Sequence, residues 1–167
     1  MSGRKHILAL ILVTSVISVL GATELRGASK ADENRLDVEQ RATMATIRTI
    51  AIGVESFAVD QNRYPGPTDG AVGIDFLKKT LVPEYLSSFD WDDGWNHTMR
   101  FMSDGSQYVI VSYGSDGIPD NEDWGEGAYD EERLRAAMCG GPTSGTRRDI
   151  VFMDGEFCQY PERLADQ

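Results

Sequence analysis

Histidine, cysteine and basic residues are scarce in this chain of 167 residues. It has 2 histidines and 2 cysteines, and 16 Lys and Arg stand against 27 Asp and Glu, so the formal net charge is -11. Phosphate binding needs clustered basic residues, so we expect no contact with nucleic acid. Cys139 and Cys158 have neither the number nor the spacing of a zinc or iron–sulfur site. The acidic surface favours cations instead.

The shortage of histidine also limits catalysis. His6 lies near the N-terminus, so a catalytic triad would have to be built around His97, whose place beside a turn predicts a capping or surface role. Ser115 and Ser144 lie near glycines but outside the strand–turn–helix pattern of a nucleophile elbow. A glycosidase-type carboxylate pair and sugar stacking by tryptophan stay open. We therefore expect no enzyme, with a small secreted carboxylate-dependent hydrolase as an alternative.

Residues 1–22 have the pattern of an export signal. Two basic residues precede an uncharged apolar run, residues 7–22, whose last residues are small enough for a leader peptidase. A spanning helix needs about 20 apolar residues, although about 17 can serve, so both a cleaved signal peptide and an uncleaved anchor stay open. Either places residues 23–167 outside the cytoplasm, periplasmic or secreted. Contact with the membrane would come only through residues 7–22, if uncleaved.

A long helix over about residues 30–62 is the element that the rest of the chain must cover. Its first half is polar nearly all round and is expected to project from the domain or fray. It should end near residues 60–62, before two X-Pro pairs. In its second half, apolar residues at three- and four-residue steps fall on one face: Ile47, Ile50, Ala51, Val54, Phe57 and Ala58.

Short elements follow the helix. Two β-hairpins are predicted around Asp-Gly turns, at Asp104-Gly105 and Asp154-Gly155. A further turn at residues 90–96 contains Asp93-Gly94, a pair that suits positive φ. The expected elements are helices at 75–81 and 129–138, strands at 98–102, 107–113, 149–153 and 156–160, and loops at 64–73 and 139–145. The two cysteines could pair in an oxidising compartment, which would contribute about 3 kcal/mol, or one could be buried and free.

Residues 116–132 hold eight acidic residues and no basic one. Asp116, Asp120 and Asp123 lie close together beside Gly117 and Pro119, which fix a tight backbone path. Ca²⁺ takes roughly six to eight oxygen ligands, and a rigid turn can supply several of them from one short segment. We expect a Ca²⁺ site here, with a solvated acidic loop as the alternative.

Three segments, taken in order, resemble the major pseudopilin family of type II secretion systems. They are Val59–Pro65 at the end of the long helix, Asp93–Asn96, and Tyr108–Gly117. The corresponding signals of that family are Asp-Asn-x-x-Tyr-Pro, Asp-Pro-Trp-Gly, and Ser-x-Gly-x-Asp-Gly followed by Asp-Ile. The resemblance covers about residues 38–117 and resumes at Asp149-Ile150. The usual prepilin peptidase motif is lacking.

The resemblance implies an α+β, pilin-like fold with a long N-terminal helix on a small antiparallel sheet, a C-terminal calcium loop, and an inserted acidic segment over 117–148. It also implies an extracytoplasmic structural or assembly protein, with other pseudopilin-like subunits or secretion components as partners. A stand-alone periplasmic binding module unrelated to secretion is the alternative. By position, the family's metal ligands correspond to Ser112, through its side chain or its carbonyl, Asp116 and Asp149. To these the local density of acids adds Asp120 and Asp123.

Overall fold

The computed structural model describes residues 34–66, 70–71, 74–121 and 130–162. The expected export signal of residues 1–22 lies outside this part of the chain. By its internal contacts the chain divides into two units, residues 1–37 and 38–167, and the second carries the fold described below.

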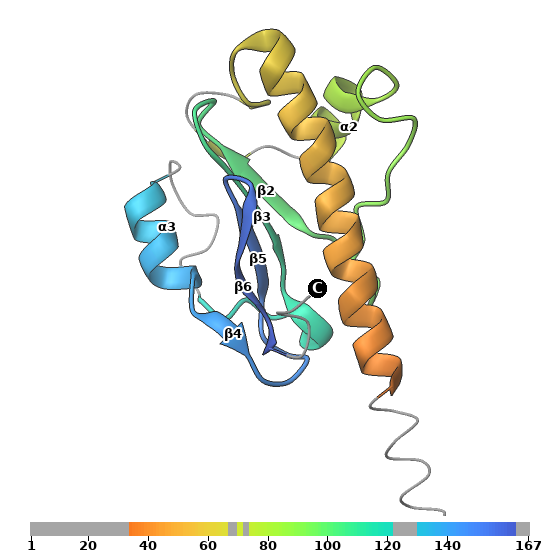
Figure 1. Cartoon of the computed structure of the whole chain (residues 1–167), viewed down its shortest axis with the longest axis vertical. Coiled ribbons are helices and arrows are strands. Elements are labelled where there is room, and N and C mark those ends of the chain that lie inside the picture. The colour runs from red at the N-terminus through yellow and green to blue at the C-terminus, as the bar shows by residue number, and fades with distance from the viewer. Residues whose placement is uncertain (1–33, 67–69, 72–73, 122–129, 163–167) are drawn as a thin grey trace, which may run out of the picture. The chain divides into compact units, whose positions relative to one another are not determined.

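The long helix runs over Asn34–Gln61 and ends where the sequence predicts. Within the second unit it lies along one face of a sheet (Figure 1). Ile47, Ile50 and Val54 of the predicted apolar face are fully buried there. By length and composition alone the helix could also cross a membrane, a test that core helices of soluble proteins pass as well.

The first half of the long helix was predicted to project from the domain or fray. That prediction is wrong for the turns around Gln40 and Thr43. Gln40 and Thr43 are buried, with 6 % and 0 % of their surface exposed. The amide of Gln40 donates to the carbonyl of Gly145 at 3.0 Å. These polar residues bury because they bond to loops that are distant in the sequence, which a helical pattern cannot reveal.

The described residues form a six-stranded sheet in the order β1-β2-β3-β5-β6-β4. Four of its neighbouring pairs are antiparallel, while β4 runs parallel to β6. β1 and β4 lie in segments predicted to be loops, and that prediction is wrong for these residues. The strands are β1 (Gly70–Ala71), β2 (Arg100–Ser103), β3 (Tyr108–Ser112), β4 (Gly141–Thr143), β5 (Ile150–Met153) and β6 (Glu156–Pro161).

The two predicted hairpins are confirmed. β2 pairs with β3 around Gly105, which has φ of 88°, and β5 pairs with β6 around Asp154 and Gly155, with φ of 49° and 96°. The carboxylate of Asp154 also accepts the N–H of Tyr108 at 2.8 Å, so the turn of one hairpin is bonded to a strand of the other.

Both faces of the sheet are covered. The long helix and α2 (Ile74–Leu81) pack on one face, over a core that includes Tyr108 and Ile110. α3 (Glu131–Met138), capped by Asp130, packs on the other face against Val109 and Val111. A disulfide joins Cys139, directly after α3, to Cys158 of β6. The α+β, pilin-like class is confirmed, with a mixed sheet in place of a wholly antiparallel one.

Candidate functional site

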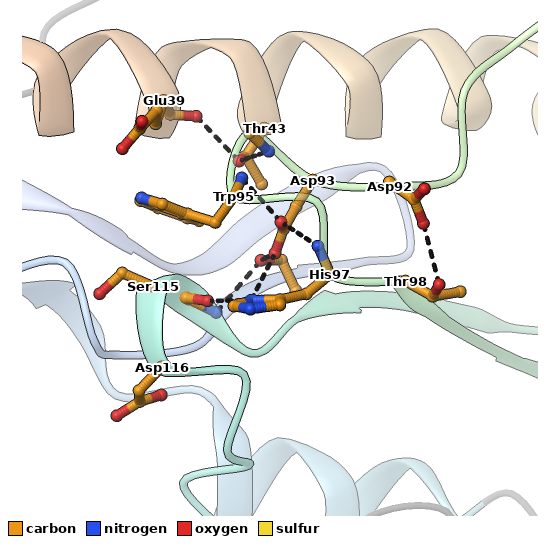
Figure 2. Close-up of polar contacts among 12 residues, drawn as sticks. Glu39, Thr43, Asp92, Asp93, Trp95, His97, Thr98, Ser115 and Asp116 are labelled. Carbon is orange, nitrogen blue, oxygen red and sulfur yellow. Dashed lines mark hydrogen bonds and ion pairs between the residues drawn. The ribbon is translucent and has the colours of Figure 1, made fainter.

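The carboxylate of Asp93 organises the turn that precedes β2 (Figure 2). Its Oδ1 accepts the backbone N–H groups of Trp95 and His97, each at 2.9 Å. Its Oδ2 accepts the hydroxyl of Ser112, at the end of β3, at 2.6 Å. Asp93 is only 5 % exposed, and these bonds replace the water that its charge has lost.

Gly94 brings this turn against the backbone of the long helix. Its N–H donates to Oγ1 of Thr43 at 2.9 Å, and that hydroxyl donates to the carbonyl of Glu39, also at 2.9 Å. A Cβ at position 94 would collide with the same carbonyl, so glycine is needed for close approach. The expectation of positive φ at Gly94 is wrong, because Asn96 takes the left-handed conformation instead, with φ of 63°.

The ring of His97 lies over the loop that follows β3. Its Nδ1 is 3.0 Å from the carbonyl oxygen of Gly114, and since a carbonyl only accepts, Nδ1 carries the proton. A Cβ at Gly117 would lie 3.2 Å from the imidazole. Gly114 and Gly117 both have φ of 67°. His97 therefore holds the start of the acidic segment against the turn.

Asp120 and Asp149 bind each other although 29 residues separate them. The N–H of Asp149 donates to Oδ2 of Asp120 at 2.9 Å, and the N–H of Asp120 donates to Oδ2 of Asp149 at 3.1 Å. Asp149 is 1 % exposed, and the side chain of Asp120 is 23 % exposed. This pair closes the base of the insert between residues 117 and 148.

Two residues that the sequence analysis did not identify also contact this pair. The amide of Gln159, on β6, donates to Oδ2 of Asp120 and to the carbonyl of Asp149, both at 3.0 Å. Nη1 of Arg148 lies 3.2 Å from Oδ1 of Asp120. Arg148 directly precedes Asp149, a signal that could have been used. Gln159 could not have been found, because its place depends on the pairing of β5 with β6.

One oxygen of the pair, Oδ1 of Asp149, is buried and has no hydrogen-bond partner among the described residues. Burial raises the pKa of this carboxyl from its usual 3.8 to about 7. The bond from the Asp120 backbone and the charge of Arg148 lower it, and the charges of Asp120 and Asp116 raise it. A buried carboxylate oxygen without a donor is stabilised only by a proton or a cation.

The structure brings together two of the five predicted metal ligands, Asp120 and Asp149. Asp116 is exposed in a short 3₁₀ turn, η1 (Gly114–Asp116), where its Oδ1 accepts the N–H of Ile118 at 3.2 Å. It is near enough for its charge to act on the pKa of Asp149.

The other two predicted ligands are not part of this pair. The hydroxyl of Ser112 donates to Oδ2 of Asp93 and accepts the N–H of Gly114. Asp123 lies outside the described residues. Within the ranges that the structure describes, no three His, Cys, Asp or Glu side chains converge on one point.

Two of the residues considered for catalysis or sugar stacking, Trp91 and Ser115, have structural contacts. The indole of Trp91 is buried and donates to the carbonyl of Met99. Oγ of Ser115 lies 3.1 Å from Oγ1 of Thr146, across the loop that His97 holds. Trp124 lies outside the described residues.

Comparison with known proteins gives two matches and one negative result. The family described as "Type II secretion system (T2SS), protein G" matches residues 32–127, a range that holds the long helix, the Asp93 turn and Asp120 but not Asp149. The type II secretion system core protein G of Xanthomonas campestris pv. campestris is 25 % identical over 134 residues, which is 79 % of this chain and 85 % of that protein. No solved structure matches the chain.

Proposed function

The chain belongs to the type II secretion system protein G family, and we propose that it is a non-enzymatic structural subunit of pseudopilin type that works outside the cytoplasm. The family match covers the long helix and the Asp93 turn, which are the parts that shape the domain. Three large apolar side chains of the long helix support an assembly role. Val38, Ile52 and Val59 are 64 %, 63 % and 83 % exposed. They lie 14 and 7 residues apart, so they share one face, opposite the buried one.

The partner that we propose for this face is the same helix of a second copy. Ile52→Cys should form disulfide-linked dimers when membranes from cells that make the full chain are oxidised, because a shared helical face brings the two positions together. The two native cysteines are already paired and do not compete. Lys79→Cys, at an exposed position of α2, is the matched control. Equal crosslinking of both variants, or none, would contradict an interface on the helix.

We further propose that a Ca²⁺ ion fixes the base of the acidic segment. The observation that carries this proposal is the buried Oδ1 of Asp149, which has no partner among the described residues and lies on a carboxylate bonded to Asp120. Carboxylate and carbonyl oxygens are the ligands that Ca²⁺ prefers. Asp120 and Asp149 would hold the ion, with Asp116, Asp123 and the carbonyl of Ser112 as the further candidates.

When bound, the ion would supply the positive charge that these carboxylates lack. The protein contributes the positions. Gln159 and the two backbone N–H groups fix Oδ2 of each aspartate, which leaves each Oδ1 as the oxygen available to a metal. Without a cation, the like charges of Asp116, Asp120 and Asp149 repel, so the segment should loosen.

Thermal melting of the full chain in detergent, in EDTA and in millimolar Ca²⁺, tests this site. A ligand that binds only the folded state adds about 2.7 kcal/mol at a hundred times its dissociation constant, so the melting temperature should rise. Asp149→Asn should abolish the rise. A matched concentration of NaCl controls for ionic strength. If Ca²⁺ gave no more than the salt control, the segment would have no calcium site.

A further inference from the structure

The Asp120–Asp149 pair presents four carboxylate oxygens in four different states. Oδ2 of Asp149 accepts one N–H, and Oδ2 of Asp120 accepts an N–H and the amide of Gln159. Oδ1 of Asp149 is buried without a partner among the described residues. Oδ1 of Asp120 faces the guanidinium of Arg148 at 3.2 Å. Of the two oxygens left over by the protein's own hydrogen bonds, one is therefore already next to a positive charge.

Arg148 is placed so that its side chain can leave without disturbing the fold. Its side chain is 53 % exposed, and its Nη1 lies 3.2 Å from Oδ1 of Asp120. Exposed ion pairs of this kind are weak, because water solvates both partners well. The backbone at this position is held independently, since it passes close to Gly114 and leads directly into the buried Asp149.

We infer that Arg148 is an internal competitor for the cation at the Asp120–Asp149 pair. Its guanidinium occupies Oδ1 of Asp120 when no ion is bound, and a divalent cation that takes this oxygen displaces it into solvent. Arg148 would thereby weaken the affinity of the site and set the ion concentration at which the base of the segment is fixed. The inference rests on the proposed Ca²⁺ site and assigns to this chain's own residue a role that the family resemblance does not supply.

A purely structural ion pair would behave differently. If Arg148 only held Asp120 in place, its removal would leave the ligand less ordered, and metal binding would weaken. Competition predicts the opposite sign, because removal frees the oxygen and takes away a positive charge that repels the ion. The direction of the change in affinity therefore separates the two roles.

Isothermal titration of the full chain with CaCl₂, for the wild type, Arg148→Gln and Arg147→Gln, tests the inference. Arg147 is the adjacent exposed arginine, so both variants change the net charge equally. We expect Arg148→Gln to bind Ca²⁺ roughly tenfold tighter, as the loss of one adjacent unit charge allows, and Arg147→Gln to stay within about twofold of the wild type. In EDTA the melting temperature of Arg148→Gln should be lower than that of Arg147→Gln.

The possible outcomes separate the competition from the site itself. If the wild type binds Ca²⁺ and Arg148→Gln binds it equally or more weakly, competition is overturned while the calcium site stands. Equal tightening by both variants would reduce the effect to net charge and also overturn it. Absence of binding in all three proteins would overturn the site and the inference together. Should Arg148→Gln fail to fold, Arg148→Lys keeps the charge on a shorter side chain and should bind Ca²⁺ more tightly than the wild type.

Discussion

Two buried aspartates, Asp93 in the turn before β2 and Asp149 at the base of the insert, are treated very differently by the fold. Asp93 and Asp149 are 5 % and 1 % exposed. Asp93 accepts three hydrogen bonds that use both of its oxygens. Asp149 accepts one bond on Oδ2, while its Oδ1 has no partner in the described ranges. Burial of a carboxylate is thus stabilising only where the chain supplies donors, and elsewhere it creates a demand for a cation or a proton.

The origin of the donors explains the contrast. Two of the three donors to Asp93 are the N–H groups of Trp95 and His97, two and four residues further along the same turn. They are in place as soon as the turn forms. The donor to Asp149 is the N–H of Asp120, 29 residues away, which is in place only when the whole segment is closed. A local carboxylate can be satisfied by its own turn, whereas a distant one depends on loop closure.

The largest effect should come from breaking the satisfied site. Asp93→Ala leaves two backbone N–H groups and the Ser112 hydroxyl without an acceptor, so we expect a loss of about 3 kcal/mol in the free energy of unfolding. Urea denaturation in EDTA measures it. Asp92→Ala is the matched control, because Asp92 is exposed and, among the described residues, its carboxylate accepts the hydroxyl of Thr98 at 2.9 Å. Asp92→Ala should lower the free energy of unfolding by no more than about 1 kcal/mol. Similar losses in the two variants would contradict the role given to Asp93.

A smaller effect of variable sign should come from the unsatisfied site. In EDTA at pH 8, Asp149→Asn removes a buried charge and keeps the shape of the side chain, so we expect the free energy of unfolding to change by no more than about 1 kcal/mol, in either direction. Asp93→Asn should clearly lower the free energy of unfolding, because an amide nitrogen cannot accept the hydrogen bonds that Asp93 accepts. Equal effects at the two positions would erase the contrast between them.

The raised pKa of Asp149 predicts how its contribution to stability depends on pH. The pKa of Asp149 is raised in the folded protein to about 7, so the folded state keeps a proton that the unfolded state has already released. The stability from this group is complete at pH below 3.8 and is lost as the pH rises toward 7. Urea midpoints measured from pH 5 to pH 8 in EDTA should therefore fall further for the wild type than for Asp149→Asn. Parallel curves for the two proteins would contradict the raised pKa.

Local patterns in the sequence predicted much of the fold. Asp104-Gly105 and Asp154-Gly155 located both hairpins, because hairpin turns need residues that tolerate positive φ. The apolar spacing of Ile47, Ile50 and Val54 identified the buried face of the helix. These features depend on residues that are neighbours along the chain, where sequence reasoning is strongest.

What the sequence did not reveal depends on pairings between distant segments. Gln40 is buried because Gly145 offers its carbonyl, and Gly94 is required because the helix backbone passes beside it. β4 exists only because β6 lies alongside it, since its three residues, Gly141–Thr143, have no strand pattern of their own. In the candidate metal site, Asp120 was proposed from the local density of acids and Asp149 from the family resemblance. Arg148 directly precedes Asp149 and could have been considered. Gln159 could not, because its place depends on the pairing of β5 with β6.

The two edges of the sheet have a consequence for solubility. The outermost strands of the described sheet are β1, with two residues, and β4, with three residues that include Pro142. Proline lacks an N–H to donate, and so short an edge offers another chain little unpaired backbone on which to add a strand. Sheet-to-sheet aggregation through these edges is therefore disfavoured. The helix face that we propose as an interface between copies would instead act through its side chains.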